Sequence, residues 1–344
     1  MKSGTAIAVV IPFYQREKGI LARALRSVFA QDIPEDVSLK VVIVDDASPV
    51  SPAEDIASVT FDPRHKIELI SQPNGGPGAA RNRGLSTLDP EETPFVAFLD
   101  SDDEWKPNHL RKALATLSAS PDHDFYFCDH TRFNTPRSWF EESEIFGKWA
   151  RGEISPAPAP VPGLENIYRM PQRLAFSAFL AEYLSQTSTV VYRFAKFPEA
   201  RFDTDLRSAG EDHMLWITLA SKAETVVFST ERNVICGEGV NIYFSAFDWN
   251  LPQTTDRYGY LVVFLTKLRR NFQMEEPDRR MIDTRLGKFS KVYAYLLARG
   301  LAKGRTPNGA LLSQLLKLDP ARVLGLPVAL VLMLKDKRSG NWDW

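Results

Sequence analysis

The first 130 residues alternate between short apolar runs and segments whose apolar residues recur at helical spacing, as in residues 21–29. The apolar runs are rich in β-branched residues, which is typical of buried strands. We predict a helix at residues 108–118 and strands at residues 6–11, 39–44, 66–71, 95–99 and 124–128. Strands that alternate with helices favour an α/β fold, with a Rossmann-like, mostly parallel central sheet flanked by helices.

The pattern becomes less regular after about residue 133. Residues 155–163 are rich in proline and predict an extended loop or a linker. We expect two further helices at residues 175–184 and 211–220, and one strand at residues 189–192. From residue 258 onward the pattern is helical, with many basic residues. We therefore divide the chain into an α/β domain at residues 1–235 and a mainly helical C-terminal region at residues 236–344. The α/β domain has two halves, at residues 1–130 and 131–235.

Polar clusters follow four of the predicted strands, and their sequences are PFYQRE, DDAS, NGGPGAARNRG and DSDDEW. In open α/β sheets, ligands bind at the carboxyl ends of the strands. The coincidence of all four clusters with strand ends carries more weight than any one of them. We therefore expect a ligand site at this edge of the sheet.

An acidic cluster of Asp100, Asp102 and Asp103 follows the strand at 95–99. Carboxylates at alternate positions can converge on one hard cation, and Mg²⁺ or Mn²⁺ keeps water and phosphate oxygens as its other ligands. The alternative is a solvated turn with a helix cap, which aspartate also favours. Asp103 is the acid that we expect to cap the next segment.

Two other clusters offer contacts for a nucleotide. Asp46 can accept a hydrogen bond from the imide N–H of a uracil ring or from a ribose, although an Asx-turn is an equal alternative. In the loop at residues 74–84, Arg81 can reach a base or a phosphate while the glycines let the backbone approach. The loop lacks the ending of a Walker A motif and fails the dinucleotide pattern.

Glu211 and Asp212 begin the predicted helix at 211–220. A carboxylate at this position is favoured by the helix dipole and can be a cap alone. Asp212 can alternatively take a proton from an attacking hydroxyl as a general base, and the sequence leaves these two roles even. His213 is another candidate base, although a histidine in the first turn of an amphipathic helix is more often structural.

Composition and net charge limit the kinds of molecule that the protein is expected to bind. A hydrophobic content of 44% and a charged content of 25% are those of an ordinary globular protein, and the net charge of −1 argues against nucleic-acid binding. Cys128 and Cys236 do not indicate a disulfide framework, so we expect a cytoplasmic protein. Trp139, Trp149 and Trp249 either contact a ligand or, as is more frequent for tryptophan, belong to the core.

The sequence contains no run of about twenty apolar residues that could span a bilayer. The nearest approach is residues 323–334, a shorter segment that carries Pro327 and is flanked by basic residues. Two interpretations stay open: a helix in the membrane interface, or a buried helix with a solvated basic end. The first would place the protein peripherally on the inner face of the cell membrane.

In this order, the clusters resemble those of the family 2 glycosyltransferases, the large inverting group with the GT-A fold. The elements that carry the resemblance lie between residue 5 and about residue 225, and they are VVIPFYQRE, VVIVDDAS, NGGPGAARNRG, FVAFLDSDDEWKPNHL and GEDHMLW. The resemblance implies that residues 1–235 form a GT-A domain, whose halves bind the nucleotide sugar and the acceptor. The segment GEGVNIYFSAFDWN further resembles bacterial exopolysaccharide glucosyltransferases of the succinoglycan type.

The resemblance also implies roles for single residues. Those that match the donor-nucleotide site are Pro12, Phe13, Tyr14, Asp46, Arg81 and Asp100. Asp100 and Asp102 match the two metal-binding acids, so the resemblance implies that Asp102 binds the metal directly and that Asp100 supports the metal or a ribose. Asp212 matches the catalytic base. Candidates for contact with the acceptor are Glu211, Trp139 and Trp249. Where some relatives place a metal-binding histidine, this chain offers Cys236 and Glu238 instead.

The reaction that the resemblance implies is the inverting transfer of a sugar, with glucose as the first candidate, from a UDP-sugar. The acceptor would be a hydroxyl of a glycan or of a lipid-linked oligosaccharide in bacterial exopolysaccharide biosynthesis, and the cofactor Mg²⁺ or Mn²⁺. Two alternatives stay open: a nucleotidyltransferase that releases pyrophosphate, and a non-catalytic nucleotide- or sugar-binding module. A glycoside hydrolase would explain neither the glycine–arginine loop nor Asp46.

Overall fold

The computed structural model describes residues 5–135, 137–207, 209–237, 249 and 251–339. The chain divides into two compact units. The first consists of Met1–Thr204 and Leu215–Val240, and the second of Asp205–Met214 and Asn241–Trp344. The short segment Asp205–Met214, which our sequence-based division placed in the α/β domain, therefore groups with the C-terminal helices.

The first unit is built on one sheet, which has ten strands among the described residues. The strands are β1 Thr5–Phe13, β2 Val37–Asp45, β3 Lys66–Ser71, β4 Phe95–Phe98, β5 Glu104–Trp105, β6 His123–Arg132, β7 Ala159–Pro160, β8 Ile167–Pro171, β9 Val191–Arg193 and β10 Thr225–Cys236. Their order is β3-β2-β1-β4-β9-β6-β10-β8-β7, with β5 paired to β10. Strands β3, β2, β1 and β4 are parallel, and so are β6 and β10, while β9 runs antiparallel between the two groups.

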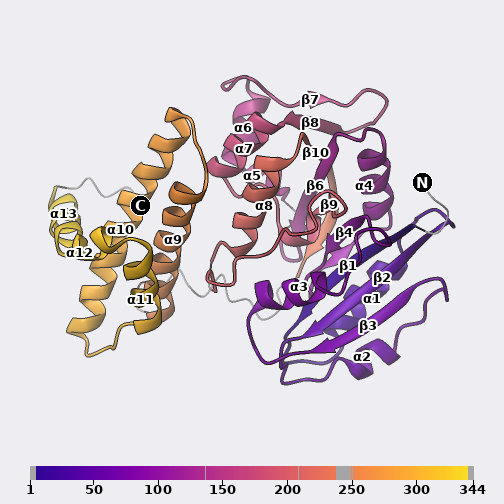
Figure 1. The fold of residues 1–344 in the computed structure, drawn as a ribbon, viewed down its shortest axis with the longest axis horizontal. Helices are drawn as coiled ribbons and strands as arrows, with labels where there is room; N and C mark the ends of the chain where they lie inside the picture. Colours follow the sequence, from indigo (N-terminus) through magenta and orange to yellow (C-terminus); the bar gives the residue numbers. More distant parts are fainter. Residues whose placement is uncertain (1–4, 136, 208, 238–248, 250, 340–344) are drawn as a thin grey trace. The chain divides into compact units, whose positions relative to one another are not determined.

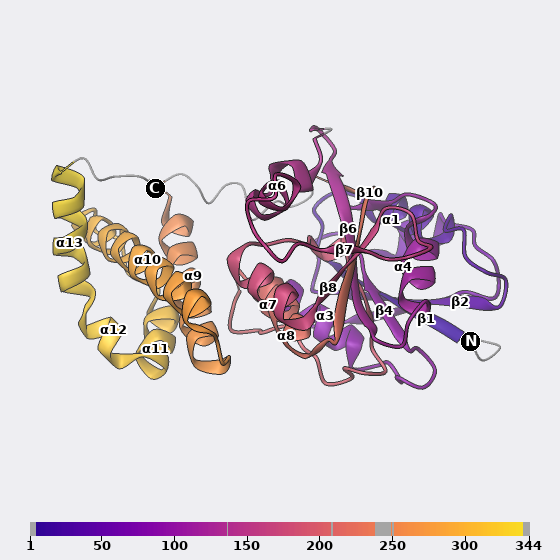
Figure 2. The same ribbon diagram turned by 90° about the horizontal axis from the view of Figure 1, so that it is seen from above.

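Helices cover both faces of this sheet (Figure 1). They are α1 Ile20–Phe29, α2 Ala53–Ala57, α3 Pro77–Leu85, α4 His109–Ser118, α5 Trp139–Glu142, α6 Glu144–Ala150, α7 Gln172–Ala181 and α8 Glu211–Lys222, with a 3₁₀ turn η1 at Thr187–Thr189. In the view of Figure 2, α1 and α4 lie on one side of β6 and β10, and α7 and α8 on the other.

Residues of β1 alternate between these two layers because successive side chains of a strand point to opposite faces. Ile7, Val9 and Ile11 belong to a fully buried cluster with apolar residues of α1 and α4. Val10 points the other way, towards α3, where Gly84 allows a close approach: a Cβ at this glycine would lie 2.6 Å from Val10 Cγ1. The predicted α/β class, with a mostly parallel central sheet, is confirmed.

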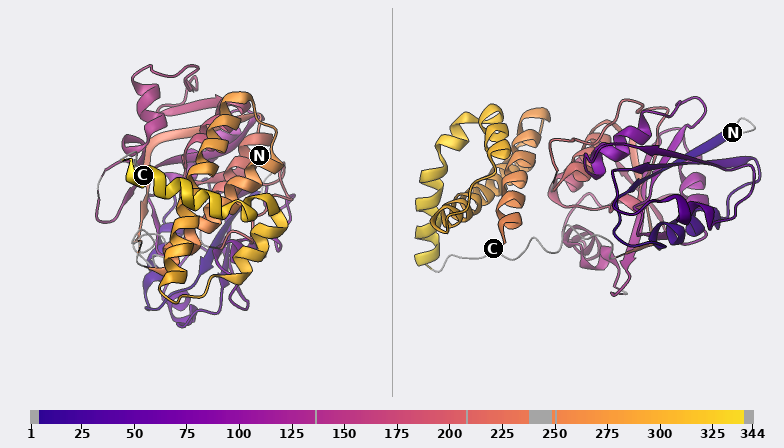
Figure 3. Two further views of the ribbon diagram at one scale, coloured as in Figure 1. Left: turned by 90° about the vertical axis from the view of Figure 1, so that its left-hand side faces the viewer. Right: turned by 90° about the horizontal axis from the view of Figure 1, so that it is seen from below.

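The second unit consists of helices among its described residues (Figure 3). They are α9 Pro252–Asn271, α10 Glu276–Ala302, α11 Gly309–Leu318, α12 Pro320–Leu324 and α13 Leu326–Arg338. Helix α10 packs against both α9 and α13. In the part of the chain that the structure describes, no helix has the length and hydropathy needed to cross a bilayer.

Candidate active site

The loops that follow β1, β2 and β4 are joined to one another by Gln15. Its backbone N–H donates to Ser48 Oγ at 2.8 Å, and Ser48 Oγ donates back to the carbonyl of Gln15 at 2.9 Å. The Gln15 side chain, which is buried, donates through Nε2 to Ser101 Oγ at 2.9 Å. Three of the polar strand-end clusters therefore form one connected structure, as the parallel topology led us to expect.

Asp46, at the end of β2, shapes the glycine loop that precedes α3. Its Oδ1 accepts hydrogen bonds from Gln72 Nε2 at 2.7 Å and from the backbone N–H of Gly75 at 2.8 Å, and its Oδ2 accepts from the N–H of Gly76 at 2.8 Å. The Asx-turn that we considered for this cluster is formed by Asp45, whose Oδ1 accepts from Ser48 N. Because a carboxylate has about four acceptor positions, Asp46 retains capacity for one further donor.

Asp100 and Arg81 form a close ion pair at the end of β4. Arg81 Nη2 lies 2.6 Å from Asp100 Oδ1, and the arginine is 4% exposed. Gln186 Nε2 donates to the second oxygen, Oδ2, at 3.3 Å. The guanidinium also lies over the ring of Phe202, 5.1 Å from its centroid. Arg81 therefore brings a fixed positive charge to the acidic cluster and orients Asp100.

Asp102 has a different environment. Its carbonyl accepts a hydrogen bond from Arg23 Nη2 at 2.9 Å, and this contact anchors the backbone of the loop to α1. Burial, with Asp100 beside it, raises the pKa of the Asp102 carboxyl to about 6. Among the described residues, no side chain donates a hydrogen bond to this carboxylate. Asp100 and Asp103 both accept hydrogen bonds from side-chain donors, so Asp102 is the acid most open to a ligand.

Asp103 joins the acidic loop to two distant segments. Its Oδ2 accepts from Ser188 Oγ at 2.6 Å and from Gln186 Nε2 at 3.0 Å, and its Oδ1 accepts from the N–H of Gly237 at 2.7 Å. Burial, together with Asp100 and Asp102, raises the pKa of Asp103 well above its usual range. We expected Asp103 to cap the following segment, but it instead connects η1 and the end of β10 to the acidic loop.

Gly237 packs directly against the backbone of the acidic loop. A Cβ at this position would lie 2.1 Å from the carbonyl oxygen of Asp102 and 2.8 Å from its carbonyl carbon. Only a residue without a side chain fits there without a shift of the loop. The end of β10 therefore supports the position of Asp102 by direct backbone contact.

The turn after β1 contributes less side-chain surface than we expected. Phe13 is 1% exposed and belongs to the hydrophobic core. Its carbonyl accepts from Asp46 N at 3.0 Å, so a contact from Phe13 to a donor nucleotide would have to involve its backbone. Pro12 and Tyr14 are half-buried and remain candidates for contact with the base.

The candidate base, Asp212, lies in the first turn of α8 and belongs to the second unit, whereas the acidic cluster belongs to the first. Its Oδ1 accepts from the N–H of His213 at 2.7 Å. The His213 ring stacks on Phe264 of α9, with centroids 5.2 Å apart, which fits the structural role that we considered for it. Glu211 and Asp212 are both half-buried. Their predicted roles stay predictions.

The candidate acceptor tryptophans are packed against other aromatic groups. Trp139 is half-buried, with the ring of His130 stacked at 5.4 Å and the guanidinium of Arg132 at 5.4 Å from its centroid. Trp249 packs in the second unit, 6.0 Å from the ring of Tyr295. These contacts are those of a supporting position, and contact with an acceptor stays a prediction for both.

The acids fit a metal that is shared with a nucleotide. Within the described ranges, no group of three or more His, Cys, Asp or Glu side chains is arranged to hold a metal ion. Mg²⁺ and Mn²⁺ nevertheless bind through one or two carboxylates when phosphate oxygens and water complete the coordination. Asp102, with Asp100 beside it, supplies this number of ligands. Cys236 is buried, and Glu238 lies outside the described residues, as does nearly all of the GEGVNIYFSAFDWN segment.

Comparison with known proteins decides the family. The model of glycosyl transferase family 2 matches residues 8–170. Succinoglycan biosynthesis protein ExoW of Rhizobium meliloti (strain 1021) is 32% identical over 321 residues, which are 93% of this chain and 95% of that protein. The chain belongs to glycosyltransferase family 2. Succinoglycan biosynthesis protein ExoO of the same organism is 35% identical over 100 residues, 29% of this chain and 26% of that protein.

Solved structures confirm the fold of this family 2 glycosyltransferase. S. aureus TarS in complex with UDP superposes with a TM-score of 0.57 at 19% identity, over 98% of this chain and 92% of that chain. The mannosyltransferase PcManGT from Pyrobaculum calidifontis, in complex with GDP-Man and Mn²⁺, gives a TM-score of 0.52 at 19% identity, over 96% and 87% of the two chains.

Sequence reasoning missed the residues that hold the acids of the glycosyltransferase in place. They are Gln15, Ser101, Gln186, Ser188 and Gly237. One signal was available, because residues 185–189 are five consecutive polar residues directly before an apolar strand. Such a run usually indicates an exposed loop, but here Ser185, Ser188 and Thr189 are fully buried.

Replacing Asp102 with asparagine should stabilise the metal-free protein at high pH. A carboxyl whose pKa is about 6 when folded and 3.8 when unfolded binds its proton more tightly in the folded state. It therefore lowers the free energy of unfolding progressively as pH rises through this window. We expect Asp102→Asn to raise that free energy by about 1–3 kcal/mol at about pH 8 with chelator present, and to change it little at about pH 4. Denaturant titrations at both pH values would measure this, and equal stabilities at about pH 8 would contradict it.

Replacing Gly237 with alanine should weaken metal-dependent donor binding by about tenfold or more, since the new methyl group displaces the backbone that carries Asp102. Calorimetric titration of UDP with Mn²⁺ would measure the loss. Gly287→Ala is the matched control, because nothing lies within 4 Å of a Cβ at that position of α10. Equal affinities of the Gly237→Ala variant and the control would show that this contact does not position the loop.

Proposed function

We propose that this protein is an inverting glycosyltransferase that moves a sugar, with glucose as the first candidate, from a UDP-sugar to a hydroxyl group. The acceptor we propose is a glycan or a lipid-linked oligosaccharide of bacterial exopolysaccharide biosynthesis. The similarity to a succinoglycan biosynthesis protein over nearly the whole chain supports the pathway class. Structures of TarS in complex with UDP and with UDP-GlcNAc support a UDP-sugar as the donor.

One observation carries the proposal: the Arg81–Asp100 ion pair lies in the same strand-end site as Asp102, a carboxylate to which no described side chain donates. In this proposal Asp46 and Tyr14 contact the base, and Asp100 contacts the ribose or the metal. A divalent ion, Mg²⁺ or Mn²⁺, would be held by Asp102 and would neutralise charge on the leaving diphosphate. Arg81 would add a second, permanent positive charge to the donor site.

Asp212 is the base in this proposal. It would accept the proton of the acceptor hydroxyl as that oxygen attacks the anomeric carbon, and the configuration at that carbon inverts in a single displacement. Its place in the first turn of α8 puts the carboxylate at the positive end of the helix dipole. Glu211, in the same turn, is our candidate for an acceptor contact.

A panel of nucleotide sugars would test the donor. We expect slow release of UDP from UDP-glucose without acceptor, faster release with Mn²⁺ or Mg²⁺ than with chelator, and little release from GDP- or TDP-sugars. Release of pyrophosphate would instead identify a nucleotidyltransferase. Donor binding without turnover, across a broad set of glycan acceptors, would instead identify a non-catalytic binding module.

Replacing Asp212 with asparagine should lower the rate of transfer by about 10²–10⁴-fold while the affinity for the donor changes little. The reason is that asparagine keeps the shape of the side chain but cannot accept the proton. Glu211→Gln is the matched control in the same helical turn, and we expect it to raise the KM for the acceptor more than it lowers kcat. If Asp212→Asn abolishes binding of UDP and Mn²⁺ instead, Asp212 belongs to the donor site and not to the chemistry.

A further inference from the structure

An exposed apolar stripe runs along α12 and α13. Leu324, Val328 and Val331 follow one another at four- and three-residue spacing, so they lie on one side of the helical segment. Their exposed fractions are 78%, 62% and 65%. Leu332 and Leu334, which are also exposed, widen the stripe. We call these five residues the apolar stripe.

The opposite side of α13 is already used for packing within the unit. Met333 is fully buried and forms a core cluster with Val292 and Leu296 of α10. Lys291 and Asp336 add an ion pair between the same two helices at 2.7 Å. Helix α13 is therefore held on α10 by one side, and the stripe is not needed for that contact. An apolar surface of this kind on a folded unit is typical of a docking site.

Positively charged residues follow the apolar stripe towards the end of α13. Lys335 and Arg338 continue the same spacing from Val331, and both are exposed. Residues 320–339 contain four basic side chains and one acidic side chain, and the acidic one, Asp336, is paired with Lys291. An apolar stripe with lysine and arginine at its border is the pattern of a helix that lies in the interface of an anionic bilayer.

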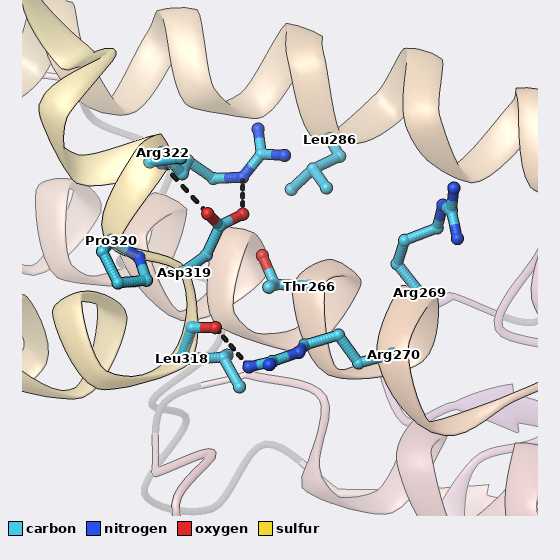
Figure 4. A pocket seen from close by; sticks show the side chains of 9 residues that line it. Thr266, Arg269, Arg270, Leu286, Leu318, Asp319, Pro320 and Arg322 are labelled. Carbon is cyan, nitrogen blue, oxygen red and sulfur yellow. Dashed lines mark hydrogen bonds and ion pairs between the residues drawn. The ribbon is translucent and has the colours of Figure 1, made fainter.

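A pocket of about 470 Å³ lies beside α12, and three arginines line it together with Leu286, Leu318 and Pro320 (Figure 4). Arg322 is held there by Asp319 Oδ2 and by Ser290 Oγ, each at 3.1 Å. Arg270 donates to the carbonyl of Leu318, and Arg269 pairs with Asp283. Asp319 also lines this pocket, and Arg322 lies on the side of α12 that contacts α10, so the pocket is separate from the apolar stripe.

We propose that the apolar stripe of α12–α13 docks on an anionic lipid bilayer, with Lys335 and Arg338 facing the lipid phosphates. Helix α13 has 13 residues and a length of about 20 Å, which is too short to cross a hydrocarbon core of about 30 Å. It would therefore lie along the surface, with its apolar side chains among the upper acyl chains. This placement deepens the proposed use of a lipid-linked acceptor, but it rests on the stripe and not on the identity of the sugar.

The full chain should sediment with vesicles of phosphatidylcholine and phosphatidylglycerol, and much less with phosphatidylcholine alone. Serine at three stripe positions (Leu324→Ser, Val328→Ser, Val331→Ser) should lower the partition coefficient by about tenfold or more. Leu301→Ser with Leu316→Ser is the matched control, because these leucines are 54% and 49% exposed on α10 and α11, outside the stripe. Lys335→Gln with Arg338→Gln should remove the preference for anionic vesicles, and added salt should weaken binding of the parent chain.

Release of UDP from a UDP-sugar by the stripe variant, measured without vesicles, would show that the variant is folded and would separate this proposal from the proposed donor chemistry. Equal partitioning of the stripe variant and the control would overturn the proposal. Failure of the parent chain to bind anionic vesicles would also overturn it. A parent chain that is dimeric by light scattering, and that the stripe substitutions convert to a monomer, would assign the stripe to a second copy of this chain instead.

Discussion

The site depends on three carboxylates held within four consecutive positions of one loop. Asp100, Asp102 and Asp103 repel one another, and burial raises the pKa of Asp102 and of Asp103. Distant segments contact two of them: Arg81 of α3 pairs with Asp100, and Gln186, Ser188 and Gly237 donate three hydrogen bonds to Asp103, although burial still raises the pKa of Asp103 well above its usual range. Asp102 accepts no hydrogen bond from a described side chain, and the charges of Arg23 and Arg81 offset only part of the rise in its pKa. A cation bound beside Asp102 would remove the energetic cost of that charge.

The first half of the fold could be predicted because its strands are buried on both faces. β1, β2 and β4 are continuous apolar runs, and their predicted and observed limits agree within two residues or so. The strands in the second half of the fold are not continuous apolar runs. β10 carries Thr230, Glu231 and Arg232 in its middle, where the pairing with β6 shifts register, and we predicted no strand there. β6 continues beyond its predicted end because Asp129 and His130 are buried, Asp129 being satisfied by Ser138 and by backbone donors.

The acids and Arg81 could be found from the sequence, since each stands where a parallel strand ends. Their supporting donors could not, because Ser188 and Gly237 are 85 and 134 positions from Asp103 and no local pattern connects them. Residue type is also a poor guide to side-chain orientation, because Phe13 matches a family position for donor contact while its side chain fills the core. A motif specifies where the backbone of a site lies more reliably than it specifies which side chains face the ligand.

The C-terminal helices are more than an appendage to the catalytic fold, because they hold the turn that carries the proposed base. The ring of His213, next to Asp212, stacks on Phe264 of α9, and Lys267 of the same helix pairs with Asp205 at 2.7 Å. Gly210 has a φ of 91° and a Cβ there would lie 3.0 Å from Phe264, so the residue before the helix must be glycine both for its backbone and for this packing. The rest of α8 belongs to the first unit, where Trp216 packs on Phe98 and Phe125. Helix α8 therefore begins in the second unit and ends in the first, and its first turn, in which Asp212 lies, is packed on α9.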